Sequence, residues 1–368
     1  MSHVFKPSCL PFDLWPQAHQ EAWNAALASK DILDTESVSV DWRPASIKRN
    51  TKAYGVWLSW HLANGKNISD SRPEDLVTKE NARAFVADLQ AVNVNITVSD
   101  RVQALYCVMR VLAPQSKGFD WDWLRFGMMR LRATATPSRE KITRLKSARD
   151  IYALGRKLMA EADAAEYTTD MTLIERAVSY RDGLMIALLI HRPWRRGNFA
   201  SLSIGTTFVM LDGTAVLAIA PANSKTKRRI ESEFPDDLYA PLCRYLKIYR
   251  PILMTQSVNA QRNTGPKSIE ALWVSRDGTK LHEESIKGAI ERRTRHAFGK
   301  HIPQHWFRDA VVTSLIQDAP ASARLASGVL GHSDVRITEK HYNQAQIIHS
   351  VRRHADVIAA YLHTDGAA

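Results

Sequence analysis

Cysteine is scarce in this chain, and its few copies lie far apart. The 368 residues contain three cysteines, Cys9, Cys107 and Cys243, and no Cys-x-x-Cys pair. An odd, scattered set does not form a disulfide framework or a structural zinc site, and it suits a reducing compartment. We therefore expect a cytoplasmic protein.

Long hydrophobic runs are also missing. The longest candidate is GLMIALLI at 183–190, which is too short to cross a bilayer and suits a buried helix. The opening residues, MSHVFKPSCLPF, lack a basic segment followed by an apolar core. The sequence thus predicts neither a membrane span nor a secretory signal.

Acidic residues are outnumbered by basic ones. The chain has 50 Lys and Arg against 38 Asp and Glu, a net charge of +12. This balance favours a polyanionic partner such as nucleic acid, although a basic surface can also be a solvated one without a partner. A hydrophobic content of 45% with 24% charged residues is typical of a folded globular chain. The length allows two domains.

Helical periodicity dominates the first part of the chain. The segment 46–64 has Ser46 as an N-cap and Gly65 just past its end, which predicts an amphipathic helix. Three more helices are predicted over 78–89, 99–112 and 121–132. On the helix predicted over 46–64, three basic residues lie opposite the apolar positions: Lys48, Arg49 and Lys52. They could follow a phosphate backbone, or they could be an ordinary solvated face.

The second part mixes helices with a short run of strands. FVML and AVLAIA flank Asp212-Gly213, which predicts a β-hairpin, and 228–234 can supply a third strand. Helices are predicted over 147–164, 171–191, 236–250, 283–298, 306–317 and 344–362. The fold class expected is therefore mainly α with a small antiparallel β-sheet.

The segment ATATPSREK lies between these two parts and has no apolar periodicity. We interpret it as the core of a linker. The predicted divisions are an N-terminal extension, a helical domain, the linker, a second domain, and a C-terminal helix and tail: 1–38, 39–132, 133–146, 147–346 and 347–368.

Two segments of the second domain carry arginines at positions where burial is expected. HRPWRRGNFASLSIG at 191–205 holds Arg192, Arg195 and Arg196 after an apolar helix. An arginine at such a junction needs either an anion or a core carboxylate. QHWFRDAVVTSL at 304–315 puts His305 and Arg308 on one helical face, while Trp306 and Phe307 can anchor that turn in the core. A surface His–Arg pair is the simpler interpretation.

Two further segments hold lysines, histidines and a tyrosine. NSKTKRR at 223–229, between the predicted second and third strands, carries Lys225, Lys227 and Arg228, and a basic hairpin turn is often only solvated. VLGHSDVRITEKHYNQA at 329–345 carries His332, His341 and Tyr342 in a short polar stretch. By itself the tyrosine could be a packing residue.

The order of these groups along the chain resembles that of the tyrosine recombinases, also called phage integrases: an arginine, a lysine, and then HWFR, LGHSD and TEKHY. The resemblance covers the second domain and, more loosely, the helical first half. It implies an N-terminal helical core-binding (SAM-like) domain followed by a tyrosine-recombinase catalytic domain. The activity implied is site-specific DNA recombination or integration in a mobile genetic element, with no metal, ATP or other cofactor.

The resemblance also implies a role for each candidate residue. Tyr342 is the nucleophile and forms a 3′-phosphotyrosyl bond, and Lys225, with Lys227 ranked second, protonates the departing 5′ oxygen. The remaining roles follow in the same way: Arg195, ahead of Arg196, and Arg308 bind the phosphate, His332 hydrogen-bonds it, and His305 accepts the tyrosine proton. His341 is assigned a structural or DNA-contacting role.

The chemistry explains these residue types. Breaking a phosphodiester without a metal ion requires charge neutralisation, a nucleophile, and a proton for the leaving oxygen. A guanidinium forks onto two phosphate oxygens, which a lysine cannot do. Tyrosine has an ordinary pKa of about 10, so a neighbouring group must take its proton.

The expected partner is duplex DNA, clamped between the two domains, with the basic linker crossing the backbone. The DNA contacts predicted are Lys48, Arg49, Lys52, Lys227 and Arg228. The last helix, 347–362, either docks on a neighbouring copy in a homo-tetramer or packs on its own domain. Accessory proteins could take part, no membrane is involved, and the protein would associate with the nucleoid. A type IB topoisomerase and a non-catalytic DNA-binding regulator of the same fold are the alternatives.

Overall fold

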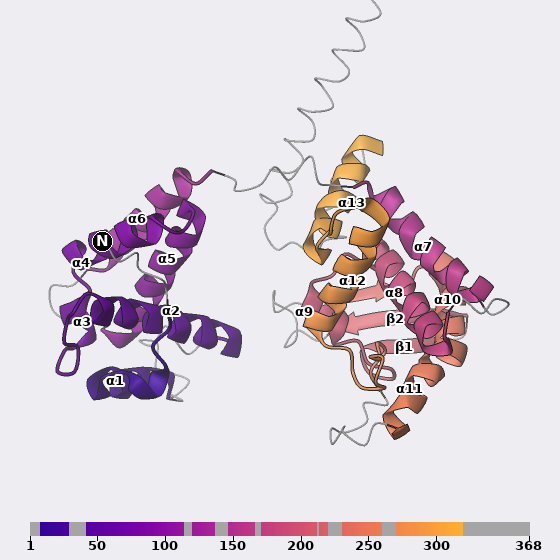
Figure 1. Ribbon diagram of the computed structural model, residues 1–368, viewed down its shortest axis with the longest axis horizontal. Helices are drawn as coiled ribbons and strands as arrows, with labels where there is room; N and C mark the ends of the chain where they lie inside the picture. Colours follow the sequence, from indigo (N-terminus) through magenta and orange to yellow (C-terminus); the bar gives the residue numbers. More distant parts are fainter. Residues whose placement is uncertain are drawn as a thin grey trace, which may run out of the picture. The chain divides into compact units, whose positions relative to one another are not determined.

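The computed structural model describes residues 8–28, 42–113, 120–136, 146–165, 171–211, 213–219, 230–259 and 270–318. The chain divides into two compact units, Met1–Glu140 and Lys141–Ala368 (Figure 1). This division falls inside 133–146, the segment predicted as the linker. Each unit has its own hydrophobic core.

The first unit is helical throughout its described part. Its elements are η1 (Phe12–Leu14), α1 (Gln17–Leu27), α2 (Pro44–Ala63), α3 (Pro73–Leu76), α4 (Lys79–Gln90), α5 (Asn95–Leu112) and α6 (Asp122–Ala133). The core of this unit includes Trp15, which is 5.1 Å from Tyr54 and 5.7 Å from Trp23 between ring centroids. The segment predicted as an N-terminal extension, 1–38, therefore contributes to this core.

Helix α2 begins earlier than the sequence pattern predicts. Arg43 occupies the N-cap position and Pro44 the first turn, so the assignment of Ser46 as the cap is wrong. Proline suits this place because an N–H in the first turn of a helix has no acceptor within the helix, so the N–H that proline lacks is not needed. Leu62 near the end of this helix is 45% exposed, whereas Trp57 is buried.

Side-chain capping accounts for the start of α4 but not for that of α5. The hydroxyl oxygen of Thr78 accepts a hydrogen bond from the backbone N–H of Asn81 at 3.1 Å, and α4 starts at Lys79, one residue after the predicted start. Helix α5 begins at Asn95, four residues before the predicted start. Ser99 does not cap it: the side chain is buried, and its hydroxyl donates to the Met128 carbonyl oxygen of α6 at 3.1 Å.

The second unit combines helices with one sheet. Its elements are α7 (Ala148–Ala164), α8 (Leu173–His191), α9 (Arg196–Ala200), β1 (Phe208–Leu211), β2 (Thr214–Ile219), β3 (Ile230–Glu233), α10 (Asp236–Arg244), the π-helical turn η5 (Tyr245–Tyr249), α11 (Arg250–Asn259), α12 (Glu283–Phe298) and α13 (Gln304–Asp318). The predicted fold class, mainly α with a small antiparallel β-sheet, is confirmed. The predicted helix over 344–362 lies outside the described residues.

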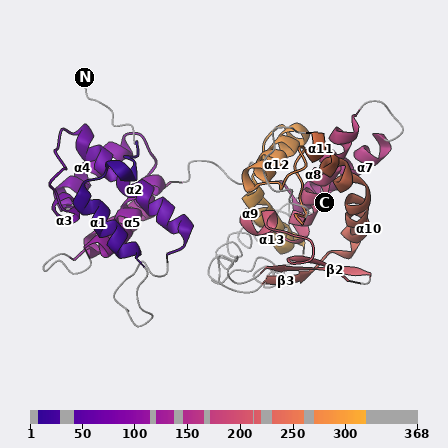
Figure 2. The ribbon, with the colours of Figure 1, turned by 90° about the horizontal axis from the view of Figure 1, so that it is seen from below.

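The sheet has the order β1-β2-β3, with both pairs antiparallel. The predicted hairpin is confirmed, and Gly213 in its turn has a φ of 76°, which glycine adopts without strain. The third strand is shorter than predicted, covering Ile230–Glu233. Figure 2 shows the sheet along one side of this unit, with the helices on the other.

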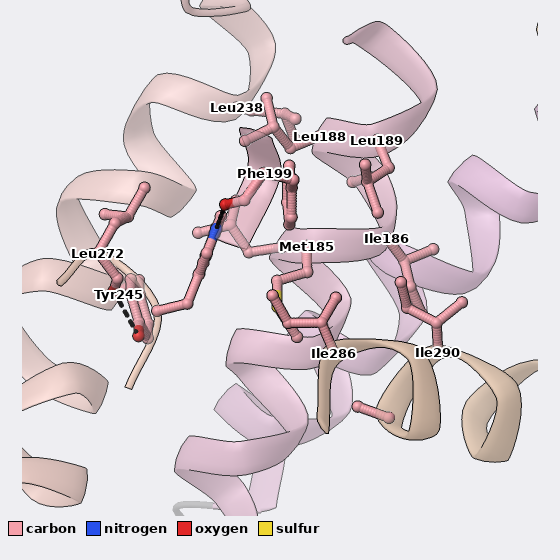
Figure 3. Close-up of a cluster of buried hydrophobic side chains, with 14 of the residues drawn as sticks. Met185, Ile186, Leu188, Leu189, Phe199, Leu238, Tyr245, Leu272, Ile286 and Ile290 are labelled. Atoms are coloured by element: carbon pink, nitrogen blue, oxygen red, sulfur yellow. Dashed lines mark hydrogen bonds between the residues drawn. The ribbon is translucent and has the colours of Figure 1, made fainter. Parts of the chain in front are cut away.

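Helix α8 runs through the centre of the second unit. Its segment 183–190 is the apolar run noted in the sequence, and Met185, Leu188 and Leu189 are fully buried. Figure 3 shows these side chains among Phe199, Leu238, Ile286 and Ile290, which come from α9, α10 and α12. Within the described ranges, none of the helices is both long and apolar enough to cross a membrane.

Several helices in this unit differ in extent from the predictions. The helix predicted over 236–250 continues through η5 and α11 to Asn259. Pro251 has no N–H to donate to the helix. The π-helical turn that precedes it has hydrogen bonds between residues five apart, in place of the usual four. Helix α13 begins at Gln304, two residues before the predicted start.

Candidate functional site

The arginine-rich segment forms a tight turn between two helices. Helix α8 ends at His191, and the N–H of Trp194 donates to the carbonyl oxygen of Arg192 at 2.6 Å across Pro193. Arg195 follows as the N-cap residue of α9. The Pro193-Trp194 pair therefore reverses the chain and places Arg195 at the start of a new helix.

Helix α13 holds this turn through two backbone carbonyls. Nη1 of Arg308 donates to the Pro193 carbonyl oxygen at 2.6 Å, and Nε2 of Gln304 donates to that of Trp194 at 3.3 Å. Phe307 is fully buried and Trp306 is 9% exposed, so the predicted anchoring of α13 in the core is confirmed.

The two guanidinium groups of Arg195 and Arg308 lie close enough to repel each other. Burial and, to a smaller extent, the charge of Arg195 together lower the pKa of Arg308 to about 10, although the charge of Asp309 opposes the change. Arg308 still carries its charge at neutral pH. Within the part of the chain that the structure describes, Arg195 forms no ion pair with a carboxylate. Two neighbouring cations of this kind are stabilised when an anion binds between them.

The other two arginines of the segment are engaged elsewhere. Nε and Nη2 of Arg192 donate to the Ser232 hydroxyl and the Glu233 carbonyl oxygen on β3. Arg196 forms ion pairs with Glu283 at 3.3 Å and Glu284 at 2.8 Å, both at the start of α12. Arg196 is thus paired with carboxylates, but these lie on the surface and not in the core, where a carboxylate partner was one expectation from the sequence.

His305 lies one helical turn before Arg308 on α13. Its side chain is exposed, and its ring contacts the edge of Trp306 with 6.2 Å between centroids. The structure therefore brings His305, Arg308 and Arg195 to one region of the second unit.

The remaining sequence candidates lie outside the described residues: Lys225, Lys227, Arg228, His332, His341 and Tyr342. Strand β2 ends at Ile219 and β3 begins at Ile230, and these two residues are paired across the sheet. Residues 220–229, which include the lysines, therefore connect two neighbouring strand ends.

The basic cluster of the first unit lies on α2. Lys48, Arg49 and Lys52 are exposed, and Nε and Nη2 of Arg49 both donate to the Asn50 side-chain oxygen at 3.3 Å. Asn50 is 1% exposed and so holds Arg49 to the helix surface. Neither residue type nor helical spacing singled out this buried asparagine in the sequence.

Comparison with known proteins identifies the fold. No family model matches the sequence, and no curated protein matches it. Among solved structures, XerH site-specific recombinase bound to palindromic difH substrate, in a post-cleavage complex, aligns with a TM-score of 0.56 and 13% identity, over 84% of this chain and 79% of XerH. The XerH pre-cleavage complex with difH substrate gives 0.53 and 14%, over 81% and 77%. The chain has the tyrosine recombinase fold.

A transposon integrase shares this fold. The Tn1549 integrase in complex with transposon right end DNA aligns with a TM-score of 0.50 and 10% identity, over 90% of this chain and 98% of the integrase chain. The tyrosine recombinase fold thus extends over most of this sequence, in agreement with the family resemblance of HWFR, LGHSD and TEKHY.

Proposed function

We propose that this protein is a site-specific DNA recombinase or integrase that cuts and rejoins DNA through a 3′-phosphotyrosyl intermediate. One observation carries the proposal: Nη1 of Arg308 on α13 donates to the carbonyl oxygen of Pro193, two residues before Arg195 at the N-cap of α9, so the two arginines meet at one turn, and the charge of Arg195 lowers the pKa of Arg308. A DNA phosphate between two such cations offsets their repulsion and accepts forked hydrogen bonds from them.

Arg195 is the better candidate than Arg196 for the first phosphate ligand. Arg196 already faces two carboxylates, and moving it to a phosphate would leave Glu283 and Glu284 without it. Nη1 of Arg308 donates a hydrogen bond to the Pro193 carbonyl oxygen, and that bond orients the guanidinium next to Arg195. The pair supplies the charge neutralisation that a metal ion supplies in other phosphoryl-transfer enzymes.

In the proposed reaction Tyr342 is the nucleophile. Its oxygen attacks the phosphorus atom while His305 accepts the phenolic proton and His332 donates a hydrogen bond to the phosphate. The bond between phosphorus and the 5′ oxygen breaks, and Lys225 gives that oxygen a proton. Rejoining runs the same steps in reverse with another 5′-hydroxyl, so the bond energy is kept and no ATP is consumed.

Both units are proposed to contact the same duplex. Lys48, Arg49 and Lys52 on α2 would follow its backbone from the first unit, and Lys227 and Arg228 from the second. The net charge of +12 supports this proposal, as do the solved complexes of XerH with difH substrate and of the Tn1549 integrase with transposon DNA. Assembly as a homo-tetramer through 347–362 belongs to the same proposal.

The experiment that tests the function is a covalent trap. Wild type, Tyr342→Phe and the matched control Tyr361→Phe are incubated with nicked duplexes from the junctions of the genetic element that encodes the protein. After denaturation, mass spectrometry identifies any peptide attached to DNA. We expect an adduct on Tyr342 in wild type and in Tyr361→Phe, and none in Tyr342→Phe.

Other outcomes select the alternatives. An adduct on a different tyrosine contradicts the assignment of Tyr342. Relaxation of supercoiled plasmid without strand exchange identifies a type IB topoisomerase activity. Tight duplex binding with no adduct on any junction identifies a non-catalytic DNA-binding protein.

A further inference from the structure

Gln304 is a buried amide at the first residue of α13. It is 7% exposed, and it lies one helical turn before Arg308, so the two side chains leave the same face of the helix. Nε2 of Gln304 donates to the Trp194 carbonyl oxygen at 3.3 Å, and Nη1 of Arg308 donates to that of Pro193 at 2.6 Å. Two successive carbonyl groups of the turn before Arg195 are therefore held from one helix.

The hydrogen bond from Gln304 acts on Arg195 through a single peptide group. The Trp194 carbonyl and the Arg195 nitrogen belong to one planar unit, so fixing the oxygen also fixes the nitrogen. On the other side of Arg195, α9 is five residues long, and the Arg195 carbonyl oxygen accepts from the Phe199 N–H at 3.0 Å. The direction in which the Arg195 side chain leaves the turn thus depends on the bond from Gln304 as well as on this short helix.

The oxygen of the Gln304 amide is placed at a cost. Among the described residues, Oε1 has no hydrogen-bond partner although it is buried. The amide cannot be turned around, because Oε1 would then face the Trp194 carbonyl oxygen, and neither oxygen can donate. A buried polar atom without a partner lowers stability, and an apolar side chain of similar size has no such atom. Packing alone therefore favours methionine or leucine here, and the glutamine serves another purpose.

We propose that Gln304 is a positioning residue for the phosphate-binding pair: its Nε2 holds the Trp194–Arg195 peptide so that the Arg195 guanidinium meets the same phosphate as Arg308. The inference rests on the proposed function. It assigns Gln304 no contact with DNA, because the residue is buried and its amide donor faces the turn. Its effect should therefore be on the rate of the chemical step and not on duplex affinity.

A neutral donor suits this place better than a charged one. Arg308 is itself proposed to bind the phosphate, so a turn held by Arg308 alone would shift whenever that guanidinium shifts. A lysine or arginine at 304 would add a third cation beside two that already repel each other, since the charge of Arg195 lowers the pKa of Arg308. The amide of Gln304 holds the second carbonyl group without adding charge.

Gln304→Met tests the inference because methionine is similar in size, adapts to the same space and cannot donate to the Trp194 oxygen. Single-turnover formation of the Tyr342 adduct is measured with saturating protein on the nicked duplexes, together with duplex affinity by gel shift and the melting temperature of the full chain. We expect the rate to fall by roughly 10- to 100-fold, the effect of a displaced catalytic group. Duplex affinity should stay within about 3-fold of wild type, and the melting temperature should not fall.

A double-mutant comparison separates positioning of Arg195 from a general defect. In the Arg195→Lys background the flexible ammonium depends little on the direction of the backbone, so adding Gln304→Met should change the rate by less than about 3-fold. Gln304→Glu has the same shape, but at neutral pH it offers only acceptors to the Trp194 oxygen. It should also be slow, and it keeps the test open if Gln304→Met does not fold.

Ser314→Ala is the matched control on the same helix. The Ser314 hydroxyl accepts from the Ala148 N–H at 3.1 Å, away from the turn, so its loss should lower the melting temperature while the adduct rate stays within about 3-fold of wild type. A wild-type rate in Gln304→Met, an equal loss with and without Arg195, or a matching loss of duplex affinity overturns the inference. Absence of a wild-type adduct overturns the proposed function itself.

Discussion

The crossing of α7 and α8 depends on two glycines, and an alanine at either should separate the helices. A Cβ atom built on Gly183 would lie 2.6 Å from the carbonyl oxygen of Gly155, and one on Gly155 would lie 2.7 Å from that of Gly183. The obstructing atoms belong to the backbone, so no rotamer change can clear them. The two helices must move apart for a methyl group to fit.

The expected cost of Gly183→Ala follows from two opposing effects. Overpacking a rigid contact costs about 3 kcal/mol, while replacing a helical glycine with alanine returns about 1 kcal/mol. The net loss of unfolding free energy is therefore about 2 kcal/mol. For a unit of this size, that lowers the melting temperature by roughly 4 to 8 °C.

Gly127 provides the matched control because it lies inside α6 and a Cβ there would meet nothing within 4 Å. Gly127→Ala should be neutral or stabilise its unit by about 0.5 to 1 kcal/mol. Scanning calorimetry and urea unfolding of the full chain measure both variants. If Gly183→Ala is as stable as wild type, or gains stability as the control does, the close approach of α7 and α8 is refuted.

Three further predictions concern pH, the phosphate site and DNA binding. His61 is buried beside Trp57, and burial lowers its pKa to about 4. As the pH drops from about 6.5 to about 4, the unfolded chain binds a proton at this histidine before the folded chain does, so the free energy of unfolding should fall by roughly 1 to 3 kcal/mol. Urea titrations of His61→Leu should show a weaker pH dependence of this free energy. Arg308→Lys should reduce adduct formation by at least about 100-fold with little loss of duplex binding, and a matching loss in a gel-shift assay would instead indicate misfolding. Duplex affinity should fall steeply with salt. Lys48→Ala and Lys52→Ala should each reduce the slope of the logarithm of affinity against the logarithm of salt concentration by about one. An unchanged slope would show that α2 is not part of the DNA interface.

Local signals account for most elements that were predicted well. Thr172 and Glu175 form a capping box at the start of α8, and the Ser147 hydroxyl oxygen accepts a bond from the Asp150 N–H at the start of α7. The hairpin follows from a glycine turn between two short apolar runs. These features depend on residues a few positions apart, and such residues are visible in one sequence.

Elements that were misjudged depend on distant partners. Ser99 resembles a helix cap, but its hydroxyl bonds to α6, 29 residues away. Trp15 and Trp23 lie in a segment with no clear periodic pattern, yet they complete the core of the first unit. A local pattern carries no information about which surface will cover a side chain.

The sequence by itself determined the fold class, the order of the strands and of the longer helices other than α1, and a set of residues suited to phosphodiester chemistry. Residue type alone could not separate three arginines within five positions, because all three have the same charge and the same donors, and only the family resemblance ranked Arg195 ahead of Arg196. The tertiary structure distinguished them by their contacts: β3 engages Arg192, two glutamates of α12 engage Arg196, and α13 brings Arg308 to Arg195. The physical reason is that a guanidinium's role depends on which acceptors surround it, and folding brings those acceptors from segments far away in the chain.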